Sequence, residues 1–66
     1  MVRAMTNEER EKQTLSDWYL DNIAPRIGTP TAVIAKDRIN GGIFRHVSLK
    51  RAQEQCEAAR RHFAID

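Results

Sequence analysis

Residues 29–47 read TPTAVIAKDRINGGIFRHV, and the conformation of this stretch decides the fold class of the chain. Asn40-Gly41 lies between two runs that contain β-branched and aromatic residues, a pattern typical of a β-hairpin with a two-residue turn. The same stretch also carries helix signals, because Thr29-Pro30 favours a helix start and Asn40-Gly41 favours a helix stop. The local sequence therefore leaves two structures open.

The distribution of apolar side chains favours the hairpin. A helix over residues 30–40 would spread its apolar residues around the whole circumference and would need burial on every side. A hairpin instead gathers the apolar side chains on one face, namely Val33, Ala35, Ile39 and Phe44. We therefore predict an α+β fold with an N-terminal helix, a central β-hairpin and a C-terminal amphipathic helix. The alternative is an all-α three-helix fold that resembles a helix-turn-helix.

The N-terminal helix is indicated by its cap and by one apolar face. Thr6 and Glu9 have the spacing of a capping box. The apolar face follows at helical spacing and consists of Leu15, Trp18, Tyr19 and Ile23. Thr14 offers a second cap, so a restart or kink of the helix there stays open. Pro25 ends the helix, because the residue before a proline avoids helical conformation, and residues 1–5 are predicted to be a frayed terminus.

The C-terminal helix is predicted from about Ser48 to Ile65, with Ser48 as the N-cap. Its apolar residues recur at alternating spacings of three and four and form a narrow seam: Leu49, Ala52, Cys56, Ala59 and Phe63. Such a seam is typical of helix-on-helix packing. We expect it to contact either residues 15–23 of the same chain or a second copy of the helix.

The length of 66 residues indicates a single small domain over residues 1–66. A chain this short buries only about 60% of its unfolded surface, so it needs support from disulfides, metal or self-association. The one cysteine, Cys56, has no partner in the chain for a disulfide. The spacings of Cys56, His46 and His62 match no zinc motif. We therefore predict a homodimer without metal.

The location of the protein is predicted from two features of the sequence. No stretch reaches the roughly 18 apolar residues that a membrane span requires. Residues 1–13 are charged and lack the apolar core of a signal peptide. Together with the single cysteine, these features predict a cytoplasmic protein.

The chain lacks the residue patterns of an enzyme. Cys56 lies within the apolar seam, where a small buried side chain is expected, and neither His46 nor His62 has a partner at a catalytic spacing. Gly41-Gly42 does not belong to a phosphate-binding glycine motif. We therefore predict no catalysis, no cofactor and no small-molecule substrate.

Basic residues concentrate in the second half of the chain, which points to an anionic partner. Residues 1–33 carry a net charge of −1 and residues 34–66 a net charge of +3. In the hairpin, Lys36 lies directly opposite Arg45, and a negative partner would relieve their repulsion. A two-stranded ribbon fits the major groove of DNA. The predicted nucleic-acid-binding residues are Lys36, Arg38, Arg45, Lys50 and Arg51.

Two functions follow from these observations. The first is a small dimeric nucleic-acid-binding regulatory protein, of phage or plasmid type in view of its size, with DNA as its partner. Thr14–Trp18 followed by Gly42–Phe44 resembles excisionases, and Gly28–Val33 is similar to part of Cro-type repressors, but no site residue is carried over from these short fragments. The alternative is an inhibitor or adaptor that binds a host protein. Its predicted interface consists of Trp18, Tyr19, Leu49, Ala52, Cys56, Ala59 and Phe63.

Overall fold

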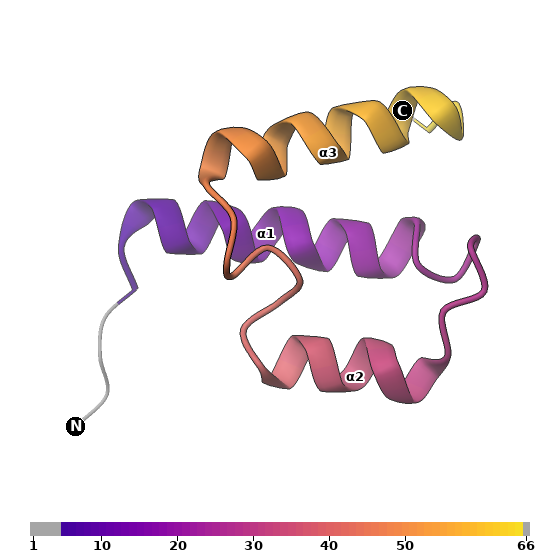
Figure 1. Cartoon of the computed structure of the whole chain (residues 1–66), viewed down its shortest axis with the longest axis horizontal. Coiled ribbons are helices and arrows are strands. Elements are labelled where there is room, and N and C mark those ends of the chain that lie inside the picture. Colours follow the sequence, from indigo (N-terminus) through magenta and orange to yellow (C-terminus); the bar gives the residue numbers. More distant parts are fainter. Residues whose placement is uncertain (1–4, 66) are drawn as a thin grey trace.

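Three helices make up the computed structural model, which describes residues 5–65. They are α1 (Asn7–Asn22), α2 (Thr31–Ile39) and α3 (Leu49–His62), and the described residues contain no strand. Figure 1 shows α1 in the middle, with α3 along one side and α2 on the opposite side. Most of the segment that was predicted to be frayed, residues 1–4, lies outside the described residues.

The predicted β-hairpin is wrong, because its first strand is the helix α2. The backbone N–H of Gly41 donates to the carbonyl of Arg38 (3.3 Å), and that of Gly42 donates to Asp37 (2.7 Å). This pair of bonds, with Gly41 at a φ of 98°, closes the C-terminus of a helix. Asn40-Gly41 is therefore a helix stop.

The expectation that a helix at this position needs burial on every side is wrong. No residue of α2 is buried. Val33 is 44% exposed and Ile39 is 84% exposed. The all-α alternative is thus correct in its number of helices. Its helix-turn-helix form does not fit, because the motif uses a turn of roughly three or four residues. Residues 23–30 connect α1 to α2 and residues 40–48 connect α2 to α3, and both connections are longer.

Helix α1 begins as the sequence predicts. The Thr6 hydroxyl accepts from the Glu9 backbone (3.1 Å), and the Glu9 carboxylate accepts from the Thr6 backbone (3.3 Å), which confirms the capping box. The helix runs without a break through Thr14, whose hydroxyl donates to the carbonyl of Arg10 (3.1 Å). It ends at Asn22, ahead of Pro25.

The core lies between α1 and α3. Ala52 is fully buried and Cys56 nearly so, and the small size of both side chains lets the two helix backbones approach closely. The predicted N-cap of α3 is confirmed, since the Ser48 hydroxyl accepts from the Arg51 backbone (3.2 Å). The partly buried residues packed against this core are Leu15, Trp18, Tyr19, Ile43 and Val47.

The connection of residues 40–48 folds back onto α1 and closes one end of the core. The Ser16 hydroxyl accepts from the backbone N–H of Ile43 (2.8 Å). The Lys12 ammonium donates to the carbonyl of Val47 (2.9 Å). Phe44 is buried and meets the Tyr19 ring edge-on, with the ring centroids 5.7 Å apart.

No helix in the described part of the chain is long and apolar enough to span a membrane.

Candidate functional site

The predicted nucleic-acid-binding residues lie on three separate elements. Lys36 and Arg38 belong to α2, Arg45 lies in the connection, and Lys50 and Arg51 form part of the first turn of α3. The strand ladder that was expected to set Lys36 opposite Arg45 is absent, because residues 31–39 are helical and residues 40–48 are turn and loop. The prediction of a two-stranded ribbon that enters the major groove is therefore wrong.

Arg38 is engaged within the chain. Its guanidinium forms an ion pair with Asp17 at 3.5 Å and a second, closer one with Asp21. Asp17 and Asp21 lie one turn apart on α1, so both carboxylates converge on the same group. Arg38 therefore attaches α2 to α1, and its charge is compensated inside the molecule.

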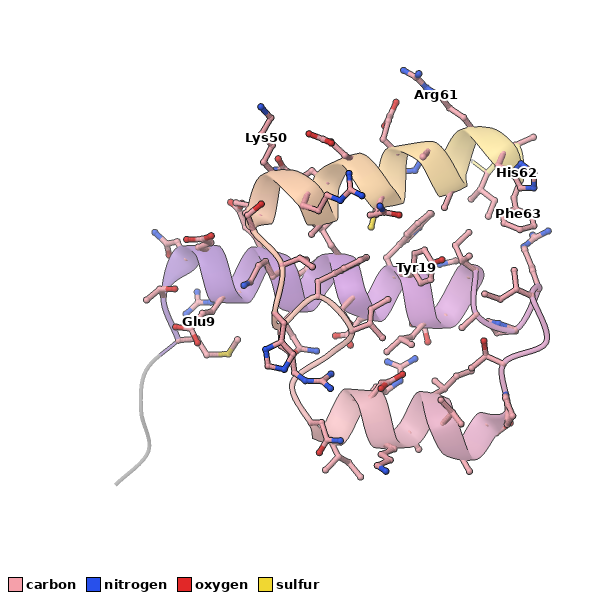
Figure 2. All side chains as sticks on the ribbon, in the orientation of Figure 1. Glu9, Tyr19, Lys50, Arg61, His62 and Phe63 are labelled. Atoms are coloured by element: carbon pink, nitrogen blue, oxygen red, sulfur yellow. The ribbon has the colours of Figure 1, made fainter. Side chains whose placement is uncertain are left out.

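The remaining predicted cations differ in their partners. The Arg45 guanidinium donates to the carbonyl of Gly42 (2.6 Å), and Arg51 lies 3.8 Å from the Glu54 carboxylate in the next turn of α3. Lys36 and Lys50 make no ion pair or side-chain hydrogen bond with the residues that the structure describes. Figure 2 shows Lys50 projecting away from α1.

The predicted protein-binding seam is used inside the chain. Ala52 and Cys56 are buried against α1, and Leu49, Ala59 and Phe63 are half-buried. Of the two expected partners of this seam, the structure shows residues of α1 in the same chain. Trp18 and Tyr19 also pack on this core, and the Arg60 guanidinium lies 4.8 Å from the centroid of the Trp18 ring. The predicted homodimer would require a different surface.

Cys56 has the surroundings of a core residue. Burial raises the pKa of its thiol, and the positive charge of Arg60 offsets part of that rise. Its Sγ lies 3.6 Å from the carbonyl oxygen of Leu15. A raised pKa keeps the thiol protonated, which is unfavourable for a nucleophile. Among residues 5–65 there is no group of three or more side chains of the types that ligate metals.

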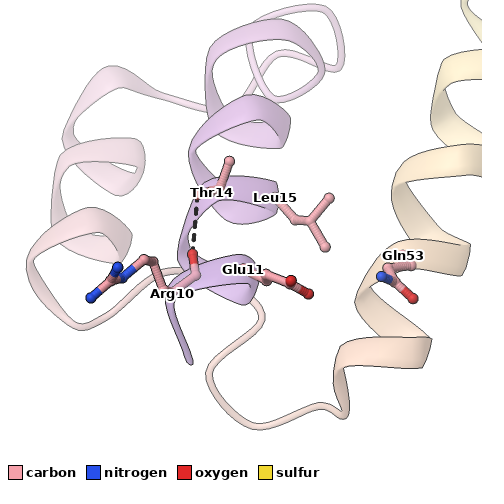
Figure 3. A pocket seen from close by; sticks show the side chains of 5 residues that line it. All are labelled: Arg10, Glu11, Thr14, Leu15 and Gln53. Carbon is pink, nitrogen blue, oxygen red and sulfur yellow. Dashed lines mark hydrogen bonds between the residues drawn. The ribbon is translucent and has the colours of Figure 1, made fainter. Parts of the chain in front are cut away.

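An open groove of about 430 Å³ separates the first half of α1 from the start of α3 (Figure 3). Figure 3 shows Leu15 pointing across it toward Gln53. Arg10, Glu11 and Thr14 complete the lining. The Thr14 hydroxyl is already bonded to the carbonyl of Arg10, and Figure 3 shows Glu11 and Gln53 extending into the groove from opposite sides.

The surface that sequence reasoning missed is the outer side of α2. Five of its nine residues are alanine, valine or isoleucine. Four exposed residues recur at helical spacing and form what we call the outer face: Ala32, Ala35, Lys36 and Ile39. Val33, 44% exposed, flanks this face. Figure 2 shows side chains projecting from α2 on the side away from α1. The outer face is thus an apolar surface with one cation.

The signal for this face was present in the sequence. The apolar run over residues 32–35 lies between a helix start at Thr29-Pro30 and a helix stop at Asn40-Gly41. A short helix with a high share of apolar residues is typical either of a buried element or of a binding surface. The hairpin prediction rests on the first of these alone.

A comparison of the chain with models of protein families, with curated proteins and with solved structures found no match. The function is therefore inferred from the surfaces described above.

Proposed function

We propose that this chain is a protein-binding module, an adaptor or inhibitor that contacts its partner through the outer face of α2. One observation carries the proposal: the most apolar helix of the chain contributes no buried side chain to the core. Ile39, the last residue of α2, is 84% exposed to solvent. Exposed apolar groups gathered on one helix face mark interaction sites more often than folding requirements.

The fold supports this role through the way it holds α2. The core forms between α1 and α3, whereas α2 is attached by the ion pairs of Arg38 and by the hydrogen bond from the backbone of Ile43 to Ser16. A helix held in this way presents its opposite side without disturbing the core. This mode of recognition, an apolar helix face laid into a groove of the partner, is common among protein-binding modules. It requires no catalysis, cofactor or metal, and the single cysteine supports a reducing compartment such as the cytoplasm.

The test compares the same substitution at two exposed helical alanines. Ala35 lies on the outer face of α2, and Ala58 lies on an exposed side of α3. Each is replaced by glutamine, and each variant is used as bait in an extract of the organism that encodes the chain. We expect Ala58→Gln to capture the same stoichiometric protein as the unaltered chain, and Ala35→Gln to lose it by at least about tenfold. Equal capture by both variants would refute the proposal.

Nucleic-acid binding is a second candidate, favoured by the first turn of α3. Lys50 and Arg51 occupy this turn and no acidic residue accompanies them. Positive charge at a helix N-terminus is unfavourable for the helix itself, so these residues suit an anionic partner better than they suit α3. A mobility shift with random duplex DNA at low salt tests it. The unaltered chain should retain the duplex, and a Lys50→Gln, Arg51→Gln double variant should not.

A further inference from the structure

We infer that the partner of α2 is a different protein, whose apolar groove carries an aspartate or glutamate opposite Lys36. The inference rests on the proposed function and goes further, because it states the chemistry of the partner and excludes a second copy of this chain at the same face.

Lys36 is the single charged residue of the outer face. It lies one turn after Ala32 and one turn before Ile39, next to Ala35, so it stands in the middle of the apolar surface. Docking of that surface brings the lysine ammonium into the interface. A buried charge needs a counter-charge, because loss of its hydration is costly.

No carboxylate among residues 5–65 forms an ion pair with Lys36. Its sequence neighbour Asp37 is half-buried and does not belong to the outer face. Asp17 and Asp21 of α1 are already paired with Arg38. The compensating carboxylate must therefore come from the partner.

A second copy of the chain is a poor occupant of this face. In a two-fold antiparallel pairing of α2, residues near the middle of the helix meet their own copies, so Lys36 would approach the Lys36 of the second copy. Nine residues of helix are also only about 14 Å long. Two such convex helices bury far less than the roughly 800 Å² per partner of a stable interface. A concave groove in a larger protein encloses more of the same helix.

Close approach to a groove is favoured by the size of the other residues. Ala32 and Ala35 lie on the same face as Ile39 and present only methyl groups there. These small side chains let the α2 backbone lie near the groove wall, while Ile39 supplies the large apolar side chain. Arg38 stays behind α2, bound to α1, and does not compete for the carboxylate of the partner.

Carbodiimide crosslinking tests the inference, because this reagent joins a lysine amine directly to a carboxylate without a spacer. The full chain is incubated in an extract of the organism that encodes it, crosslinked, purified and digested. Mass spectrometry should find the Lys36 amine linked to an aspartate or glutamate of the captured protein. That protein is then produced alone, and its affinity for the chain variants is measured.

We expect Lys36→Met to weaken binding by at least tenfold at low salt and Lys36→Arg to retain it. Arg61→Met is the control, because Arg61 is an exposed cation of α3 whose ion pair in the described residues is with Glu57 of the same helix, and it should bind unchanged. Unaltered binding of Lys36→Met would overturn the inference, since the lysine would then reach past the interface into water. The proposed function would survive that result if Ala35→Gln still failed to bind.

Other outcomes are equally decisive. A crosslink from Lys36 to a carboxylate of this same chain in a second molecule would overturn the inference in favour of self-association. Capture that disappears after nuclease treatment would overturn it in favour of nucleic acid. Unaltered capture by Ala35→Gln, or no captured protein, would remove the proposed function and the inference together.

Discussion

The buried hydroxyl of Ser16 on α1 accepts a hydrogen bond of 2.8 Å from the backbone N–H of Ile43, in the connection between α2 and α3. This bond fixes the connection at the point where the chain leaves α2. It also brings Gly42, which is buried, against the same serine. The position of α2 relative to the core thus depends on one hydroxyl and on the absence of a side chain at residue 42.

Replacement of Gly42 by alanine tests this contact. An added Cβ would lie 2.8 Å from the Ser16 Cβ and closer still to its Oγ, at a backbone φ of 89°. Gly41 is the matched control, since its φ is 98° and its nearest neighbour would be 3.8 Å away on Arg45. Positive φ alone costs roughly 1–2 kcal/mol, and overpacking adds about 1–3 kcal/mol. Urea unfolding followed by circular dichroism should show Gly42→Ala as much the less stable variant. Equal midpoints would mean that Ser16 moves aside.

The ion pairs of Arg38 should govern the mobility of α2 more than the stability of the whole chain. Exposed ion pairs contribute less than about 1 kcal/mol each, but α2 itself contributes no buried side chain that would hold it against α1. In Arg38→Gln, we expect the backbone amides of α2 to exchange with solvent faster, with α1 and α3 unchanged. Lys36→Gln, on the same helix but without an ion pair in the described chain, is the control. Amide exchange measured by NMR checks both, and equal α2 protection in the two variants would contradict the role of Arg38.

The elements that the sequence predicted correctly are those whose signals are local. The Thr6 and Glu9 side chains form a capping box wherever a helix follows them, and Ser48 caps α3 for the same reason. The apolar residues of the seam from Leu49 to Phe63 all lie on one face of the helix, so only that face can be buried. These three signals require no knowledge of the rest of the fold.

The error over residues 29–47 has a different origin. Asn40-Gly41 supplies a positive φ, and both a hairpin turn and a helix terminus require one. Burial of the apolar side chains distinguishes the two structures, and burial depends on tertiary contacts. Arg38 meets Asp17 and Asp21 across 21 and 17 residues of sequence, and no periodicity marks such a pair. The outer face of α2 was missed for the same reason, because apolar helix faces are expected to be buried and this one is exposed.

The thiol of Cys56 should make stability depend on pH in the alkaline range. Burial raises its pKa above the ordinary value of 9.0, so the folded state keeps a proton that the unfolded state releases. The stabilisation is complete below that ordinary value and is lost as the pH rises toward the folded pKa. The slope is at most about 1.4 kcal/mol per pH unit.

Cys56→Ala isolates this contribution from other groups that titrate in the same range, because it removes only the thiol. Urea unfolding between pH 7 and about pH 11 should give a flatter decline in the free energy of unfolding for Cys56→Ala than for the unaltered chain. Parallel declines would show that the thiolate is as well solvated in the folded state as in the unfolded state.

The C-terminus of α3 offers a stabilising substitution. The backbone N–H of Ala64 donates to the carbonyl of Arg61 (3.3 Å), and the N–H of Ile65 donates to the carbonyl of Arg60 (2.9 Å). The same pair of bonds closes α2 after Asn40. At the end of α2 a glycine adopts the positive φ, whereas at the end of α3 Ala64 adopts a φ of 51°. An L-residue with a Cβ is strained in this region, and glycine is the preferred residue at this position.

Ala64→Gly should therefore raise the free energy of unfolding by about 1 kcal/mol, which corresponds to an increase in Tm of about 4–8 °C for a chain of this size. Ala58→Gly is the matched control, because Ala58 is exposed in the interior of α3, where glycine costs about 1 kcal/mol. Thermal unfolding followed by circular dichroism should shift the two variants in opposite directions. A loss of stability in both would mean that the terminus of α3 does not hold Ala64 in the left-handed conformation in solution.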